Sequence, residues 1–252
     1  MIRILLNGCN GKMGQAITRT CELKDDLFVV AGVDQVKKEG TSYPVYQNAH
    51  DVNEAVDIII DFSHPSALEG ILSYAVAKNL PIVVATTGLT EDHKKLMEKA
   101  SQSIPVLLSA NMSLGINLLL DLVKRATKML HGTFDIEIVE KHHNQKIDAP
   151  SGTALAIADA VNSALSGNQM KYVYDRHSTM QKRTRDEIGI HSVRGGTITG
   201  EHTILFCGND EMIEIKHTAF SKDLLAEGAL KAAAFLADKA PGYYKMQDIF
   251  ES

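Results

Sequence analysis

The sequence predicts an α/β protein with a doubly wound parallel sheet and, after it, a second α+β domain with a mixed sheet. Three observations lead to this fold class. Short continuous apolar runs alternate with helical segments over the first 111 residues, as in parallel strands that are buried on both faces. A glycine-rich turn follows the first run directly. Beyond residue 111, apolar and polar residues alternate, as in half-buried strands.

Five strand-like runs account for most of the first half. They are IRILLN (2–7), FVVAGVD (28–34), AVDIIIDFS (55–63), PIVVATTG (81–88) and IPVLLSAN (104–111). Helices are predicted between them, around QAITRTCEL and over residues 65–79 and 90–101. Strands and helices that alternate with short connections are typical of a doubly wound parallel sheet.

The second half has a different pattern. Residues 115–130 carry apolar side chains at helical spacing, whereas 133–142 alternates like a half-buried strand. APSGTALAIADAVNSAL begins like a helix, and TITGEHTILFCG and EMIEIKHTAF alternate again. Residues 221–240 predict a closing helix. We therefore expect one domain to comprise residues 1–111 and 222–252, and the other residues 112–221.

Composition excludes several classes of function. The formal net charge is −5 and the pI is about 6.1, so the chain lacks the basic footprint of a nucleic-acid-binding protein. No apolar run reaches the roughly 18 residues that suggest a membrane helix. The three cysteines, Cys9, Cys21 and Cys207, form no CxxC pair, which favours reduced thiols and a cytoplasmic location.

The glycine-rich turn NGCNGKMG favours a dinucleotide site. Gly8, Gly11 and Gly14 lie between a strand and a helix, where a pyrophosphate needs a tight turn, close backbone approach and a helix N-terminus. Such a turn can also serve only to reverse the chain. Asp34 ends the second strand and can accept hydrogen bonds from the adenosine ribose. Its charge favours NADH over NADPH, although Lys37 or Lys38 could offset the repulsion of a 2′-phosphate.

Three further strand ends, FSHP (62–65), ATTG (85–88) and SANMS (109–113), would line the crevice at the carboxyl edge of this Rossmann-type sheet. Each of them taken alone is better explained as an ordinary strand–loop junction. Their role therefore depends on the glycine turn.

The segment EKHHNQKIDAPSGTA (140–154) concentrates reactive groups. His142 and His143 can supply an acid and a hydrogen-bond donor, and Lys146 a positive charge. The run 151–153 (SGT) opens a helix, whose free N–H groups form an anion site. Adjacent strand histidines point in opposite directions, so a shared metal ion is disfavoured and we expect no metal. The combination suits a small dianionic substrate.

The motifs together carry a family resemblance. GCNGKMG, DFSHP, ATTG, SANMS, EKHHNQKIDAPSGTA and RGGTITGEHTI occur in this order and resemble the 4-hydroxy-tetrahydrodipicolinate (dihydrodipicolinate) reductases of diaminopimelate and lysine biosynthesis. The resemblance implies a nicotinamide-binding Rossmann domain (1–111 and 222–252) and a mixed-sheet domain (112–221) that binds substrate and forms a homotetramer. It also implies reduction of a cyclic imine dicarboxylate with NADH or NADPH, by hydride transfer to ring C4 followed by protonation.

Carried over residue by residue, the resemblance makes His142 the catalytic acid/base and Lys146 a proton donor, although the sequence leaves open which of them delivers the proton. The substrate-binding positions would be His143, Ser151, Gly152 and Thr153. The cofactor-binding positions would be Gly8, Cys9, Asn10, Gly11, Lys12, Met13, Asp34, Ala85, Thr86, Thr87, Ser109, Ala110, Asn111 and Met112. Gln35 departs from the family's frequent arginine, which weakens the expectation of NADPH selectivity. Lys12 also stands for a common arginine, and SANMS for a more aromatic loop.

Two other functions fit part of the pattern. Another Rossmann reductase, such as an amino-acid or homoserine dehydrogenase, would share the fold but not HHNQKIDAPSGTA. A regulatory domain that senses NAD would need the glycine turn and Asp34, but would have no use for His142 or Lys146.

Overall fold

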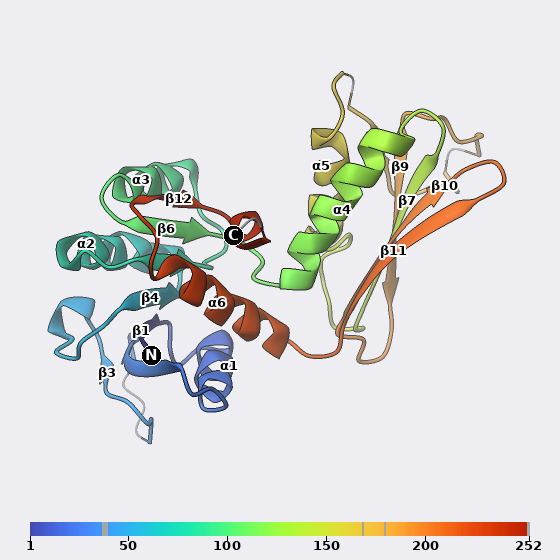
Figure 1. The fold of residues 1–252 in the computed structure, drawn as a ribbon. Coiled ribbons are helices and arrows are strands. Elements are labelled where there is room, and N and C mark those ends of the chain that lie inside the picture. Colours follow the sequence, from blue (N-terminus) through green and yellow to red (C-terminus); the bar gives the residue numbers. More distant parts are fainter. Residues whose placement is uncertain (37–39, 168, 179, 251–252) are drawn as a thin grey trace. The chain divides into compact units, whose positions relative to one another are not determined.

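The computed structural model describes residues 1–36, 40–167, 169–178 and 180–250, and it divides into two compact units (Figure 1). The first unit comprises Met1–Leu114 and Asp223–Ser252, and the second comprises Gly115–Lys222. The chain thus enters the second unit a few residues later than the sequence pattern predicts, because the turn after SANMS still packs with the first unit. Met112 and Leu114 both contact its core.

The first unit contains a seven-stranded sheet in the order β12-β6-β5-β4-β1-β2-β3. The strands are β1 (Ile2–Asn7), β2 (Leu27–Val33), β3 (Val45–Tyr46), β4 (Ile58–Asp61), β5 (Ile82–Val84), β6 (Pro105–Leu108) and β12 (Gly242–Tyr244). Each neighbouring pair described runs parallel. The chain moves outward from β1 in both directions, so the turn after β1 lies at the switch point where doubly wound sheets bind ligands.

Helices cover both faces of this sheet. The main helices are α1 (Lys12–Cys21), α2 (Leu68–Lys78), α3 (Glu91–Ser101) and α6 (Asp223–Leu236), with 3₁₀ turns at Ala49–Asp51, Pro65–Ala67 and Met246–Phe250. Ile4 and Leu6 pack with α1 and α6, whereas Leu5 packs with α2 and α3. This two-sided burial explains the continuous apolar run in β1.

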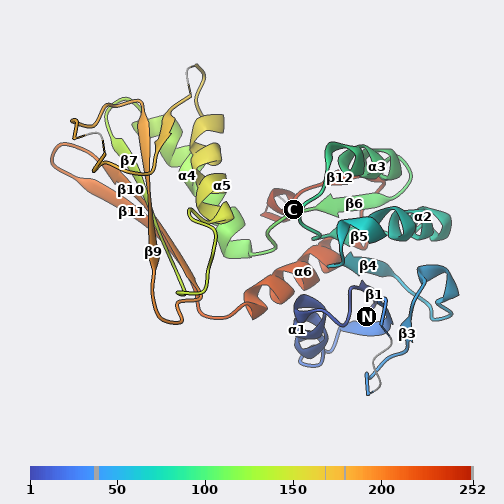
Figure 2. The ribbon, with the colours of Figure 1, turned by 180° about the vertical axis from the view of Figure 1, so that it is seen from behind.

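The second unit is a mixed five-stranded sheet in the order β11-β10-β7-β9-β8 (Figure 2). Its elements are α4 (Leu114–Leu130), β7 (Asp135–His142), α5 (Gly152–Ser163), β8 (Lys171–Val173), β9 (Glu187–Arg194), β10 (Gly200–Cys207) and β11 (Met212–Ala219). α4 and α5 pack on one face, against Ile136 and Ile138 of β7 and residues of β9 and β10. The predicted fold class, a parallel Rossmann-type sheet followed by a mixed-sheet α+β domain, is confirmed.

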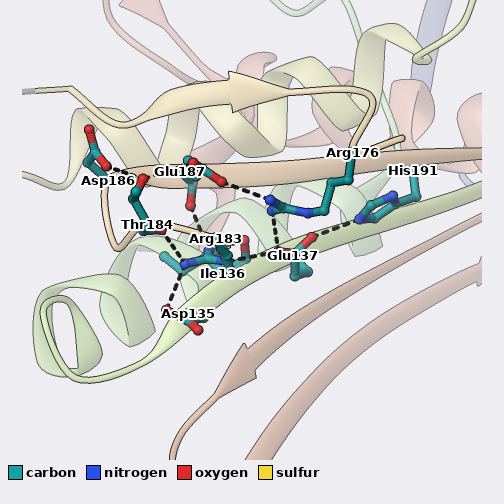
Figure 3. Close-up of polar contacts among 9 residues, drawn as sticks. All are labelled: Asp135, Ile136, Glu137, Arg176, Arg183, Thr184, Asp186, Glu187 and His191. Carbon is teal, nitrogen blue, oxygen red and sulfur yellow. Dashed lines mark hydrogen bonds and ion pairs between the residues drawn. The ribbon is translucent and has the colours of Figure 1, made fainter. Parts of the chain in front are cut away.

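The face of the second sheet opposite α4 and α5 carries a network of charged side chains (Figure 3). Glu137 accepts hydrogen bonds from Arg176 at 3.0 Å, from Arg183 at 2.9 Å and from His191 at 2.7 Å. Gly189 on β9 makes room for it, since a Cβ there would lie 1.7 Å from Glu137 Oε2. Burial alone would raise the pKa of Glu137, but these donors lower it overall. The network ties the segment before β9 to β7.

Candidate active site

The glycine turn of the first unit has the geometry of an anion cradle. Gly8 has a φ of +78°, and a Cβ there would meet Phe62 O at 2.7 Å. A Cβ on Gly14 would lie 2.4 Å from Gly8 O. Gly11 is the N-cap of α1 and makes no side-chain cap, so the start of this helix is left to other acceptors. These residues fit a dinucleotide pyrophosphate.

Asp34 lies beside this cradle, as its place at the end of β2 predicts. The backbone N–H of Asn10 donates to Asp34 Oδ2 at 3.0 Å, and Val36 N lies 3.4 Å from Oδ1. A carboxylate has about four acceptor sites, so it can still receive ribose hydroxyls. Lys37 and Lys38 lie outside the described residues.

Besides Ala85, three of the predicted cofactor positions have buried side chains. Cys9 is 2% exposed, and its Sγ occupies the space where a Cβ on Gly32 would lie. Met112 contributes to the core of the first unit, and Thr86 Oγ1 is hydrogen-bonded to Asp61 Oδ2. Any cofactor contact at these positions therefore comes from the backbone.

The remaining predicted cofactor positions lie on the loops that follow β1, β5 and β6 and in the first turn of α1, which begins at Lys12. Ala85 is buried; Met13, Ser109 and Asn111 are half-buried; Gly11, Lys12, Thr87 and Ala110 are exposed.

The centre of the second site is the side chain of Glu140, which is fully buried. Glu140 and His142 lie two residues apart on β7, so both point to the same face. His142 Nδ1 lies 2.6 Å from Glu140 Oε2. The imidazole therefore donates from Nδ1 and leaves Nε2 directed elsewhere. A Cβ on Gly200 would lie 3.1 Å from that Nε2, so the glycine of GEHTI leaves room for the ring.

Arg194 neutralises the buried carboxylate. It stands opposite His142 in the β7–β9 register and donates to both Glu140 oxygens, at 2.8 and 2.7 Å. Its Nη2 also donates to the carbonyl of Asp148, at 2.6 Å, and so holds the loop that carries Lys146. Burial tends to raise the pKa of Glu140, but hydrogen bonds from Arg194, Ser192, His142 and Ser151 lower it to about 2. The carboxylate is ionised at neutral pH.

The same carboxylate fixes the start of α5. Ser151 N donates to Glu140 Oε1 at 3.1 Å, and Ser151 Oγ caps the helix by accepting from Ala154 N. A Cβ on Gly152 would meet no atom within 4 Å, so open space lies in front of the helix start. Thr153 is half-buried in the first turn. This first turn is the place at which the sequence predicts an anion site.

Lys146 and His143 lie in the connection between β7 and α5. Lys146 Nζ is 2.8 Å from Asp148 Oδ1 and its side chain is 21% exposed, whereas the Asp148 side chain is 59% exposed. Lys146 N donates to the carbonyl of His143, which is half-buried. The structure thus brings His142, the loop of Lys146 and the helix start at Ser151 together around Glu140.

His202 on β10 completes the cluster. It stands opposite Glu140 in the β7–β10 register, and its ring centroid is 5.2 Å from that of His142. Ser151 Oγ lies 2.9 Å from His202 Nε2, and no described residue bonds to Nδ1. Burial, together with the nearby His142, lowers the pKa of His202 to about 4. A neutral His202 forms one hydrogen bond with Ser151, through Nε2.

Sequence reasoning missed Glu140, Arg194 and His202. Each lies inside a quoted motif, EKHH, RGGT or GEHT, but their meeting depends on the register between β7, β9 and β10. The strand β9 was not predicted at all. The sequence indicates only that Glu140 and His142, two residues apart on one strand, share a face.

The described residues contain no cluster of three or more His, Cys, Asp or Glu side chains that could hold a metal ion. None of their helices is long and apolar enough to cross a membrane.

Comparison with known proteins identifies the family. The N-terminal part of dihydrodipicolinate reductase matches residues 2–112, and its C-terminal part matches residues 115–250. The chain belongs to the dihydrodipicolinate reductase family. The predicted resemblance is thereby confirmed, and the chain is an oxidoreductase of diaminopimelate and lysine biosynthesis.

Individual relatives cover the whole chain. A 4-hydroxy-tetrahydrodipicolinate reductase of Caldanaerobacter subterraneus subsp. tengcongensis is 50% identical over 99% of this chain and 98% of its own length. One from Clostridium tetani is 47% identical over 100% and 98%. Among solved structures, dipicolinate-bound dihydrodipicolinate reductase from Paenisporosarcina sp. TG-14 has the same fold, with a TM-score of 0.81 and 23% identity over 97% of both chains.

We expect the protonation of His202 to set a pH dependence of stability. The unfolded histidine has a pKa near 6.5 and the folded one about 4, so the unfolded chain binds the proton first as the pH falls. The free energy of unfolding keeps the full contribution of neutral His202 above pH 6.5, and it decreases by about 3 kcal/mol as the pH falls toward 4. The measurement is denaturant unfolding of the wild type and of His202→Gln at several pH values.

The difference in the free energy of unfolding between the wild type and His202→Gln should become smaller as the pH falls. The exposed His131→Gln, in the same unit, serves as control and should shift stability by less than about 0.5 kcal/mol. A constant difference between wild type and His202→Gln would show that His202 is not held neutral. NMR titration of the His202 ring checks the midpoint directly.

Proposed function

We propose that the chain reduces the cyclic imine dicarboxylate of the diaminopimelate and lysine pathway to tetrahydrodipicolinate with NADH or NADPH. The observation that carries this proposal is the arrangement around Glu140, which gathers an imidazole, the loop of a lysine and an open helix start. Cationic groups and amide donors are what a small dicarboxylate needs. The Paenisporosarcina structure is described as dipicolinate-bound, which fits this substrate class.

A nicotinamide bound by the chain would supply the hydride for ring C4 of the substrate. The chain's own residues bind the substrate before this step and protonate the product after it. The N–H groups of Gly152 and Thr153, with Ser151 as cap, hold a carboxylate at the start of α5, and His143 supplies a further donor. Lys146 offers an ammonium group near that carboxylate. Negative charge that builds on the ring nitrogen and the adjacent carboxylate is stabilised by these donors more than the ground state is.

His142 is the residue best placed to move a proton. Its Nδ1 donates a hydrogen bond to the ionised Glu140, so proton exchange takes place at Nε2. Glu140 holds the ring in one orientation, as a buried carboxylate does for a general acid or base elsewhere. Either His142 or Lys146 delivers the proton that completes the reduction. Because Asp148 binds the Lys146 ammonium at 2.8 Å, substrate carboxylate would compete with Asp148 for it.

The first unit would hold the cofactor. The cradle formed by the glycine turn, from Gly8 to Met13, accepts the pyrophosphate, and Asp34 accepts the ribose hydroxyls. The strand ends at 85–87 and 109–112 would contribute mainly backbone groups and small side chains. The unit 1–114 with 223–252 is thus the proposed dinucleotide-binding domain, and 115–222 the proposed substrate-binding domain.

One assay separates this function from the alternatives. Freshly prepared cyclic imine dicarboxylate is mixed with the protein and NADH, and the loss of NADH absorbance is followed. Rapid oxidation supports the proposal. Binding of NADH without turnover would indicate a sensor of the cofactor, and turnover of an amino acid or homoserine instead would indicate a different dehydrogenase.

We expect Lys146→Ala to lower kcat by on the order of 10²-fold or more, because a positioned proton donor and cation is lost. NADH affinity should change little, since the residue belongs to the second unit. Lys141→Ala is the matched control: it removes the same charge from β7, where Lys141 pairs with Glu201 at 3.3 Å. Near-normal kcat in Lys146→Ala would refute the assigned role.

We also propose a homotetramer that forms through the second domain. The sheet face without helices exposes Val193 (44%) and Met212 (58%), and by the strand register it is the face that carries Glu137 and His191. Apolar side chains on a broad sheet face are commonly covered by another copy of the chain. Analytical ultracentrifugation at micromolar concentration should give a tetramer. A monomer under those conditions would contradict the proposal.

For the cofactor we expect that both NADH and NADPH work, with NADH favoured by roughly tenfold or less, about 1.4 kcal/mol. Asp34 accepts ribose hydroxyls but repels a 2′-phosphate, and one exposed lysine offsets this by at most about 1 kcal/mol. The measurement is kcat/KM for both cofactors at two ionic strengths, because salt screens exposed lysine–phosphate contacts. A strong NADPH preference that survives high salt would show that Asp34 and Gln35 do not set the selectivity.

A further inference from the structure

A second buried carboxylate lies in the first unit, at the end of β4. Asp61 is fully buried, and four donors surround it. Oδ1 accepts from Asn7 Nδ2 at 2.8 Å, from Ser63 Oγ at 2.6 Å and from Ser63 N at 3.1 Å. Oδ2 lies 2.8 Å from Thr86 Oγ1. All four donors are uncharged, in contrast to the guanidinium that faces Glu140.

A count of hydrogens favours the protonated state of Asp61. The Thr86 hydroxyl has a single hydrogen but two acceptors, Asp61 Oδ2 at 2.8 Å and the carbonyl of Ser63 at 3.1 Å. If Asp61 is ionised, one of these acceptors has no hydrogen to receive. If Oδ2 carries a proton, Asp61 donates to Thr86 and Thr86 donates to Ser63. Every close contact then has one hydrogen, and no isolated charge is buried.

The three partners of Asp61 stand where the first unit would meet its cofactor. Asn7 immediately precedes Gly8, and it is paired in register with Asp61 across β1 and β4. Ser63 and Thr86 belong to the strand ends FSHP and ATTG. Phe62, next to Asp61, supplies the carbonyl that a Cβ on Gly8 would meet at 2.7 Å. A negative charge on Asp61 would therefore lie close to the proposed pyrophosphate cradle and oppose anion binding.

We propose that Asp61 is held as a neutral carboxylic acid and acts as a positioning residue that joins the ends of β1, β4 and β5 beneath the cofactor. Its proton lies on Oδ2 and is shared with Thr86, while Oδ1 collects the donors from Asn7 and Ser63. Burial raises the pKa of Asp61, which agrees with this state. The cofactor part of this inference rests on the proposed function, whereas the protonation state does not.

Infrared difference spectroscopy tests the protonation state. The spectrum of wild type minus Asp61→Asn at neutral pH should contain the C=O stretch of a carboxylic acid. The matched control is Asp57→Asn, just before the other end of β4, where Arg3 binds the carboxylate at 2.6 Å and lowers its pKa. That difference should show carboxylate bands instead. Carboxylate bands in the Asp61 difference would overturn the proposal.

Binding of NADH in the absence of substrate tests the positioning role. Asp61→Asn keeps a neutral group that can donate from Nδ2 to Thr86, so its Kd should stay within about threefold of wild type. Asp61→Ala, with far-UV circular dichroism as a check of folding, loses all three links and should bind NADH roughly tenfold or more weakly. Equal affinity of a folded Asp61→Ala, or strong loss in Asp61→Asn, would refute the role.

The outcomes are separable from those for the proposed function. A wild type that binds NADH but leaves the cyclic imine unchanged would refute the reductase activity and leave the Asp61 measurements valid. A wild type that binds neither NADH nor NADPH would refute both the cofactor proposal and the positioning role. The infrared bands decide the protonation state in either case.

Discussion

The contact between Glu140 and Arg194 is the interaction on which the second site depends. A carboxylate without solvent exposure is stable only if its charge is compensated and its lone pairs are occupied. Arg194 compensates the charge with two hydrogen bonds, and His142 and Ser151 N donate to the remaining lone pairs. Because these partners come from β7, β9 and the start of α5, one ionised group fixes the strand, the Lys146 loop and the helix start relative to one another. Loss of the arginine would leave a buried charge, so the site and the local fold are coupled.

Glu140 and Asp61 are buried carboxyl groups, one in each unit, and their pKa values shift in opposite directions. Glu140 faces a guanidinium, and its pKa falls to about 2. Asp61 faces an amide, a peptide N–H and two hydroxyls, and its pKa rises. Burial acts in the same direction on both, so the difference lies in the partners: a cation favours the ionised form more than neutral donors do. An ionised group suits an imidazole that exchanges protons, whereas a neutral group suits the neighbourhood of a proposed anion cradle.

The sequence predicted the parts of the fold that local patterns encode. Continuous apolar runs located β1, β2, β4, β5 and β6, and glycine spacing located the turn after β1. Patterns of this kind failed for β9, where the apolar residues Ile188 and Ile190 are followed on the same face by the polar Ser192 and Arg194, so the alternation is too short to indicate a strand. Local reasoning also assigned Cys9 and Met112 to the cofactor without detecting that their side chains enter the core. Burial of a side chain next to a turn depends on the packing of distant elements, such as α6 against Met112, and no short window contains that information.

The segment 140–154 shows how much of the site a short sequence pattern predicts. Adjacent histidines attract attention, yet only His142 belongs to β7, and His143 lies in the connection that follows the strand. The informative spacing is Glu140 to His142, which puts a carboxylate beside an imidazole on one face and predicts a dyad once the segment is known to be a strand. The arginine that keeps this carboxylate ionised cannot be found in the same way, because Arg194 reaches it through the pairing of β7 with β9, over a separation of 54 residues. The pairing of Glu140 with His142 can thus be predicted from the segment itself. The ionised state of Glu140 is set by Arg194, which only the folded sheet brings near.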